Sequence, residues 1–135
     1  MILLDTNVVI ALINATSADV RKTFNVRVDQ RATIAVGSIV LHELEFGVAK
    51  SQRQRANRDL LQAFLAGPVN VLAFDDEDAA VAAALRAELE TRGTPIGPYD
   101  VLIAGQALRH KATLVTANTR EFKRVKGLKV ENWGR

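Results

Sequence analysis

The sequence contains no cysteine, and aromatic residues are scarce, with one tryptophan, one tyrosine and five phenylalanines among 135 residues. Without cysteine the chain can form neither disulfide bonds nor thiolate metal sites, and a reducing compartment suits it. No apolar run approaches the roughly 18 residues that a membrane-spanning helix needs, and the apolar N-terminus lacks the basic flank and cleavage site of a secretory signal. We therefore expect a soluble, cytoplasmic protein.

The composition that remains is that of one globular domain. Hydrophobic residues make up 48% of the chain and charged residues 24%, which is far from the composition of disordered segments. The length allows most of the apolar surface to be buried in one core. Because no repeat, linker or low-complexity tract interrupts the sequence, we expect a single domain over residues 1–135.

The positive charge is small overall but unevenly placed. The net charge is +3, yet residues 109–135 hold eight lysines and arginines against only Glu121 and Glu131. A second basic cluster comprises Lys50, Arg53, Arg55 and Arg58. Such clusters suit a polyanionic partner, because each neutralised phosphate releases counterions. A solvated surface explains them equally well.

Short apolar segments alternate with amphipathic ones along the chain. We expect strands over residues 1–4, 33–36, 69–74, 113–116 and 128–130, and helices over 8–13, 17–30, 39–50, 51–66, 75–92, 99–110 and 118–125. Ser17 and Ser38 are placed to cap two of these helices. Strands that alternate with helices pair in parallel through right-handed crossovers. The sequence therefore predicts an α/β fold, a three-layer α/β/α sandwich around a five-stranded, mainly parallel sheet.

Asp5 comes directly after the first apolar strand and before the first helix. In open parallel sheets, ligands bind outside the carboxyl ends of the strands, where this side chain is expected. An aspartate at a strand end can also do no more than begin a turn. The other acidic residues decide between these interpretations.

Glu43 and Asp100 lie where their helices should be apolar. At 100° per residue, Glu43 falls inside a broad apolar arc of its helix, whereas Glu45 points the other way. Asp100 lies in line with the apolar stripe of a later helix and in its first turn, where the helix dipole favours a carboxylate. A buried salt bridge could explain Glu43, and a first-turn acid could explain Asp100.

Taken together, these acids predict a metal site. If the fourth strand neighbours the first, Thr116 and Asn118 emerge beside Asp5 at the switch point of the sheet. Asp5, Glu43, Asp100 and Asn118 could then converge on one pocket of oxygen ligands. Such ligands suit Mg²⁺ or Mn²⁺, whereas zinc would favour histidine or cysteine. A carboxylate cluster around a divalent cation, on a chain with basic flanks, indicates phosphodiester hydrolysis.

The order of these motifs resembles that of PIN-domain nucleases. Leu4-Asp5-Thr6-Asn7 stands first, Ser38 and Glu43 form a Ser-x-x-x-x-Glu helix start, and Gly97-Pro98-Tyr99-Asp100 opens a later helix. Residues 114–122 and the Asn132-Trp133 tail resemble the VapC ribonuclease toxins of bacterial toxin–antitoxin pairs in particular. Each motif is weak alone, but the ordered set spans essentially the whole chain.

The resemblance implies an endoribonuclease that depends on Mg²⁺ or Mn²⁺, often cleaves tRNA, forms homodimers and is inhibited by a VapB-type antitoxin. The family's acidic triad carries over to Asp5, Glu43 and Asp100. Many PIN domains have a fourth acid where this sequence has Asn118, whose amide brings no charge and leaves a second metal ion in question. Glu121 could substitute, but we expect it to lie a helical turn too far on.

The same resemblance assigns roles to the site residues. Asp5 and Asp100 would hold the metal, Glu43 would ligate it or orient its water, and Asn118 would support them. Thr116 resembles the hydroxyl residue that orients the first aspartate, and Thr6 and Ser38 are supporting members of the motifs. We expect His42 and His110 at the surface, without a role in catalysis. Trp133 could stack on a base, but we favour a packing role for it.

Two other functions stay open. A phosphatase or phosphoacceptor domain also places an aspartate at a strand end, and Asp75 could serve as the phosphoacceptor. Asn7 stands where such phosphatases favour a second aspartate, however, and neither enzyme explains Glu43 or Asp100. A non-catalytic PIN-like module that binds RNA or protein is the other alternative. Asn118 favours that module, and the intact acidic triad opposes it.

Overall fold

The computed structural model describes residues 1–134, so Arg135, the last basic residue counted above, lies outside the described residues. The predicted helices and strands are confirmed, with ends that move by a few residues. The strands are β1 (Ile2–Leu4), β2 (Ile34–Gly37), β3 (Asn70–Leu72), β4 (Thr113–Val115) and β5 (Lys129–Glu131). The helices are α1 (Thr6–Asn14), α2 (Ala18–Asp29), α3 (Ser38–Lys50), α4 (Gln54–Leu65), α5 (Asp76–Thr91), α6 (Pro98–Arg109) and α7 (Thr119–Phe122).

Within residues 1–134, the strands form one five-stranded sheet in the order β3-β2-β1-β4-β5, and every pair is parallel. The expected position of the fourth strand beside the first is confirmed, because Leu3 pairs with Ala35 on one side and with Leu114 on the other. β2 and β3 follow on one side of β1, and β4 and β5 follow on its other side. Residues that follow β1 and β4 are therefore neighbours at the carboxyl edge of the sheet.

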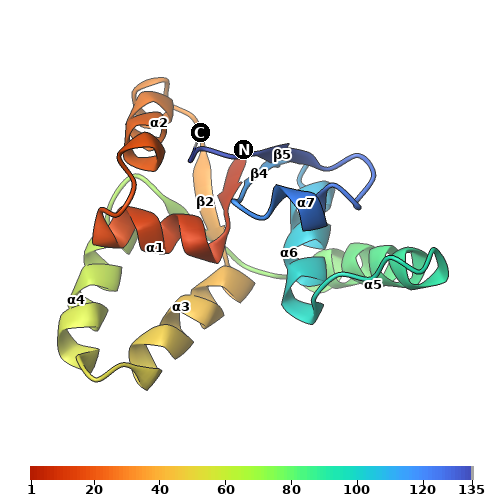
Figure 1. Ribbon diagram of the computed structural model, residues 1–135, viewed down its shortest axis with the longest axis horizontal. Coiled ribbons are helices and arrows are strands. Elements are labelled where there is room, and N and C mark those ends of the chain that lie inside the picture. Colours follow the sequence, from red (N-terminus) through yellow and green to blue (C-terminus); the bar gives the residue numbers. More distant parts are fainter. Residues whose placement is uncertain (135) are drawn as a thin grey trace.

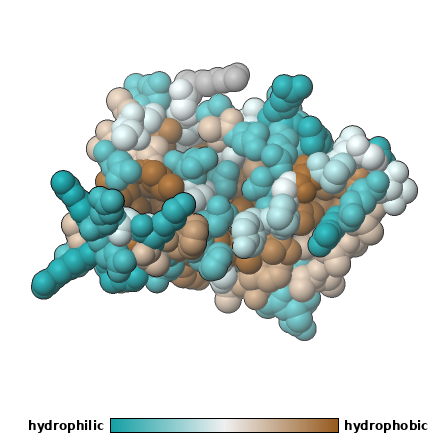
Figure 2. Space-filling view, turned by 60° about the horizontal axis from the view of Figure 1, so that its bottom comes forward, coloured by the Kyte–Doolittle hydropathy of each residue, from teal (hydrophilic) through white to brown (hydrophobic). Residues whose placement is uncertain are grey.

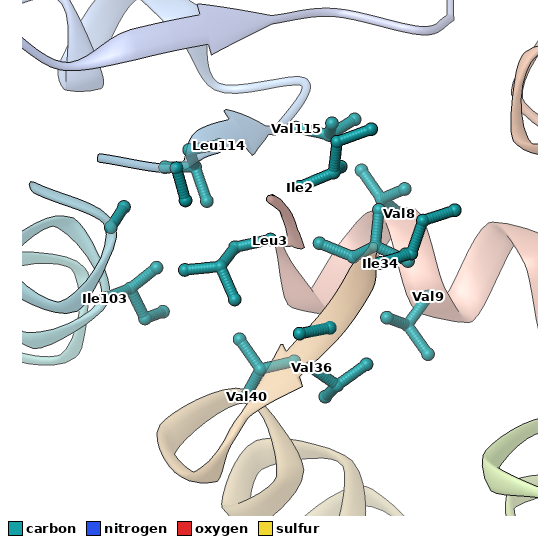
Figure 3. Packing of buried hydrophobic residues seen from close by; sticks show 14 of the residues in the cluster. Ile2, Leu3, Val8, Val9, Ile34, Val36, Val40, Ile103, Leu114 and Val115 are labelled. Carbon is teal, nitrogen blue, oxygen red and sulfur yellow. The ribbon is translucent and has the colours of Figure 1, made fainter. Parts of the chain in front are cut away.

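The helices cover both faces of the sheet. In Figure 1, α1, α2 and α4 lie on one side of the strands and α5 and α6 on the other, while α3 contacts both α1 and α6. The alternation of side chains along β1 serves both layers. Figure 3 shows Leu3 on the side of Ile103 from α6, and Ile2 near Val8 from α1. All three residues of β1 are buried, as expected for a strand covered on both faces.

Two local predictions about helix starts have different outcomes. Ser17 caps α2 as expected, since its Oγ accepts a hydrogen bond of 3.2 Å from Val20 N. The prediction that Ser38 caps α3 is wrong, because Gly37 is the N-cap. The Ser38 hydroxyl instead accepts from Phe74 N at 3.1 Å and donates to the Leu72 carbonyl at 3.3 Å. Ser38 therefore ties α3 to the end of β3.

Part of the basic charge is already paired within the fold. Arg109 contacts Asp75, Glu77 and Asp78 at 2.8–3.2 Å, and Arg58 pairs with Glu45 at 3.1 Å. Asp75 is thus occupied by its cap of α5 and by Arg109. This pairing removes Asp75 as a candidate phosphoacceptor.

The histidine and tryptophan predictions are settled by burial. His42 is exposed as expected, but His110 is partly buried and its Nε2 lies 3.5 Å from the fully buried Asp78, so the surface prediction for His110 is wrong. Trp133 is buried and donates to Glu131, which confirms a packing role. Among residues 1–134, no helix has the length and apolar character needed to cross a membrane.

Candidate active site

Asp5 is held rigidly at the carboxyl end of β1. It is the N-cap of α1, and its Oδ1 accepts from Thr6 N at 2.8 Å. Its Oδ2 accepts from the buried Thr116 hydroxyl at 2.7 Å, and Thr116 Oγ1 in turn accepts from Asn118 N at 3.0 Å. The residues after β1 and β4 are therefore joined by side-chain bonds. Two donors that fix one carboxylate leave it little rotational freedom.

Glu43 approaches Asp5 from α3. Its side chain is half-buried one turn into that helix. Burial raises the pKa of Glu43, and the negative charge of Asp5 raises it further, while the Thr6 hydroxyl and His42 lower it. The two carboxylates therefore repel each other. Glu43, which the sequence places on the apolar face of its helix, thus lies close to another acid of the site.

Asp100 approaches from the first turn of α6. Burial raises the pKa of Asp100 to about 7, and a hydrogen bond to Glu121 and the charges of Glu121, Asp5 and Glu43 act in the same direction. A Cβ on Gly97 would lie 3.4 Å from Asp100 Oδ2 and 3.7 Å from Glu121 Oε1, so the two carboxylates meet beside this glycine. The charges of Asp5, Glu43 and Glu121 thus all raise the pKa of Asp100.

Glu121 belongs to the cluster, and our expectation that it lies too far along the helix is wrong. Because α7 has a single turn, Glu121 sits three residues after its N-cap Asn118 and folds back toward α6. Its Oε1 accepts from Gly97 N at 2.9 Å, which is the main reason that its pKa is lowered. The Asn-x-x-Glu spacing at a helix start was the sequence signal that could have identified this residue.

Asn118 does not take the place of a fourth acid directly. Its side chain is exposed, and Nδ2 donates to Glu121 Oε2 at 2.9 Å. Asn118 therefore orients Glu121, which brings the charge that the amide lacks. Ser38 is not in the cluster, because its hydroxyl is engaged by residues that follow β3.

The donors of this cluster suit a hard divalent cation. Carboxylate oxygens from Asp5, Glu43, Asp100 and Glu121 are the ligands that Mg²⁺ and Mn²⁺ prefer. The buried Thr6 hydroxyl lies beside Glu43 and lowers the pKa of that carboxyl, so it adds a further oxygen to the edge of the cluster. Within the same residues, no three acidic or histidine side chains are yet arranged as ligands of one ion. Ligation of one ion would therefore require these side chains to turn toward it.

An apolar groove adjoins the acids. A cavity of about 220 Å³ lies between α1, α3 and α4, with Ile10, Leu44 and Leu61 in its lining and Glu43 at its edge. Ile10 and Leu60 are large hydrophobic residues of this groove that remain 40% and 46% exposed. Figure 2 faces the side of the molecule with α3, α4 and α6, where apolar atoms gather in hollows between hydrophilic side chains.

The raised pKa of Asp100 predicts a stability effect without metal. An acid whose folded pKa of about 7 exceeds its ordinary 3.8 stabilises the fold only at low pH, and that contribution is lost as pH rises through 7. Asp100→Asn keeps a hydrogen-bond donor for Glu121 but removes the charge. In EDTA, we expect this variant to gain about 1 kcal/mol over the wild type between pH 5 and pH 8, after solvent screening of a half-exposed group.

Thermal unfolding at both pH values measures this gain. Asp59→Asn removes an exposed carboxyl of α4 outside the cluster and should show no comparable pH dependence. An Asp100→Asn variant that is no more stable than the wild type at pH 8 would contradict a raised pKa of Asp100.

Known proteins share both the sequence pattern and the architecture. Residues 2–128 match the PIN domain. The chain is 39% identical over 131 residues to the tRNA(fMet)-specific endonuclease VapC of Shigella flexneri, which covers 97% of this chain and 96% of that protein. It is also 39% identical over 131 residues to ribonuclease VapC2 of Rickettsia felis, with the same coverage.

Solved structures agree with these relatives. The crystal structure of VapBC2 from Rickettsia felis bound to a promoter DNA fragment superposes with a TM-score of 0.91 at 39% identity, over 98% of this chain and 99% of that chain. The DNA-bound VapBC of Salmonella typhimurium gives a TM-score of 0.89 at 36% identity, over 98% and 97%. The fold class expected from the sequence is confirmed.

Proposed function

Because the chain belongs to the PIN-domain family, and within it to the VapC ribonucleases, we propose that it is an endoribonuclease toxin that requires Mg²⁺ or Mn²⁺. One observation carries the proposal. Asp5, Glu43, Asp100 and Glu121 come from four separate segments and gather at the carboxyl edge of the sheet, where burial, a hydrogen bond to Glu121 and repulsion from the other three carboxylates together raise the pKa of Asp100 to about 7. Such repulsion destabilises a fold unless a cation offsets it.

The cluster divides into rigid and adjustable ligands. Asp5 is fixed by two donors and would hold the cation together with Asp100, with Glu43 as a third ligand or as the group that orients water. Glu121, oriented by Asn118 and by Gly97 N, is the added candidate on the other side of Asp100. When bound, the cation would activate water and neutralise charge on the scissile phosphate.

The chain's own side chains place the protons of the reaction. Burial and the neighbouring Glu121 raise the pKa of Asp100, so positive charge in the cluster would favour the ionised form of Asp100. Glu43, whose pKa is raised, can accept a hydrogen bond from an attacking water and keep it in line with the phosphorus. Thr116 and Thr6 N hold the Asp5 carboxylate still while this occurs.

We propose tRNA as the substrate class, and the Shigella flexneri relative narrows the first test to initiator tRNA. Purified initiator tRNA and a mixture of elongator tRNAs would be incubated separately with the protein and Mn²⁺, and the fragment ends mapped. Cleavage of either at one or few sites supports a tRNA nuclease. Absence of cleavage in both, by protein that binds Mn²⁺ in calorimetry, would exclude tRNA and leave another RNA as substrate.

A VapB-type antitoxin is the proposed partner, because solved structures to which the chain is similar are of VapBC assemblies. The apolar groove that ends at Glu43 offers a surface on which a partner segment could cover the acids. We also propose a homodimer that acts in the cytoplasm. Light scattering at working concentration tests the dimer, and a monomeric mass would exclude it.

A further inference from the structure

The strongest unexplained feature outside the acid cluster is a row of exposed side chains along α3. His42, Phe46 and Lys50 recur every four residues and so share one face of that helix. Phe46 is 60% exposed, and Lys50 Nζ lies 5.9 Å from the centre of its ring. A large aromatic ring left in solvent beneath a cation makes no contribution to the core.

Tyr99 of α6 joins this row at its N-terminal end. Its ring is 50% exposed and lies 6.0 Å from the His42 ring, at an interplanar angle of 56°. His42 precedes Glu43 and Tyr99 precedes Asp100, so the pair of rings stands immediately beside two acids of the site. The row therefore begins where the scissile phosphate is proposed to lie.

The other end of the row runs into the second basic cluster. Lys50, Arg53 and Arg55 are exposed, and the ion pairs found within residues 1–134 include none of them. Glu45, the acid of α3 outside the cluster, is paired with Arg58. From Glu43 to Lys50 the helix rises about 10 Å, which is the length of about three stacked nucleotides at roughly 3.4 Å each.

We propose that Tyr99, His42, Phe46 and Lys50 form a stacking track for single-stranded RNA on one side of the cleaved bond. The rings would stack on successive bases, and Lys50, Arg53 and Arg55 would contact the phosphates that follow, the combination by which proteins bind single strands. Stacking tolerates any base, so the track supplies affinity and register without base identity. This inference rests on the proposed function.

A second copy of the chain is the competing occupant of this face. A two-fold interface would set the same patch of each subunit against the other, bringing Lys50, Arg53 and Arg55 close to their own copies. Like charges in contact oppose such an interface. A polyanion is favoured by the same cations, and the row is continuous with the acid site.

Binding of RNA without catalysis tests the track. A fluorescein-labelled oligoadenylate of about eight nucleotides would be titrated in EDTA with the wild type and with Phe46→Ala and Tyr99→Ala, using anisotropy. Each variant should bind about 10-fold more weakly, because one stacked base is lost. Phe46→Tyr and Tyr99→Phe should retain wild-type affinity, which separates stacking from a loss of structure. Lys50→Gln should reduce the salt dependence of log Kd by about 0.7, the value of one phosphate on a single strand.

Val26→Ala is the matched control, because Val26 is 44% exposed on α2 and lies outside the row. Unchanged RNA affinity in both alanine variants would overturn the track even if the wild type cleaves tRNA. Unchanged affinity together with a change from dimeric to monomeric mass would assign the face to a second copy. If Phe46→Ala and Tyr99→Ala both weaken RNA binding but the wild type cleaves no RNA, the stacking track is supported and the proposed nuclease activity is not.

Discussion

Asp5→Asn is expected to lower the rate of RNA cleavage on the order of 10³-fold, because it removes the charge of the most firmly held of the proposed metal ligands while preserving its shape. The amide oxygen can still accept one of the bonds from Thr6 N and Thr116, so the N-cap of α1 persists. Single-turnover cleavage of tRNA at saturating Mn²⁺ measures the loss. Thermal unfolding would verify that the variant is folded.

Glu45→Gln is the appropriate control for this experiment. Glu45 lies on α3 two residues from Glu43 but points away from the cluster and pairs with Arg58 at the surface. Its loss should leave the cleavage rate within a few-fold of the wild type, since an exposed ion pair contributes only about 0–1 kcal/mol. Equal losses in Asp5→Asn and Glu45→Gln, or none in either, would contradict the assignment of Asp5.

Gly105→Ala is expected to cause the largest loss of stability. Gly105 lies in α6 where that helix crosses α5, and a Cβ there would lie 2.6 Å from both Cα and Cβ of Ala82. The clash involves backbone, so the two helices must separate. We expect a loss of about 3 kcal/mol in the free energy of unfolding, or roughly 10 °C in Tm, despite the better helix propensity of alanine.

Gly47→Ala is the matched substitution, because Gly47 also lies inside a helix, but nothing outside its own helix lies within 4 Å of a Cβ there. That variant should gain up to about 1 kcal/mol from helix propensity alone. Denaturant unfolding of both variants separates close packing from propensity. A Gly105→Ala variant as stable as Gly47→Ala would show that α5 and α6 are not packed as described.

Much of the fold follows from patterns in the sequence. Buried runs such as Ile2–Leu4, separated by amphipathic helices, correctly predicted a parallel sheet with β1 beside β4. That neighbourhood brought Asp5 and Thr116 together, and the geometry now shows the bond between them. These features were predictable because parallel strands joined by helices follow general rules of pairing and of crossover handedness.

The details that failed depend on tertiary contacts. Ser38 has the composition of an N-cap, but the end of β3 offers its hydroxyl partners that the local sequence does not contain. Glu121 was misplaced because its position depends on α7 ending after one turn and on Gly97 N as a donor from a distant loop. His110 is drawn toward the buried Asp78 in the same way. Side-chain partners far apart in sequence were not predictable from periodicity.

The two rival functions now stand differently. The phosphoacceptor alternative loses Asp75 to the cap of α5, and Asn7 is exposed beyond the strand end. The non-catalytic alternative rested on Asn118, yet Glu121 brings a fourth carboxylate to the position that the asparagine left uncharged. Activity is therefore the property that discriminates among them.

Cleavage of total bacterial tRNA before and after metal removal tests the central claim most directly. The wild-type protein, stripped with EDTA and then supplied with increasing Mg²⁺ or Mn²⁺, would be followed by the appearance of discrete fragments. The carboxylate cluster predicts no cleavage in EDTA and full recovery on addition of either ion, with a rate that tracks the occupied fraction measured by calorimetry. Cleavage that persists at the same rate in EDTA, or its absence when the protein is loaded with Mn²⁺, would contradict a metal-dependent ribonuclease that acts on tRNA.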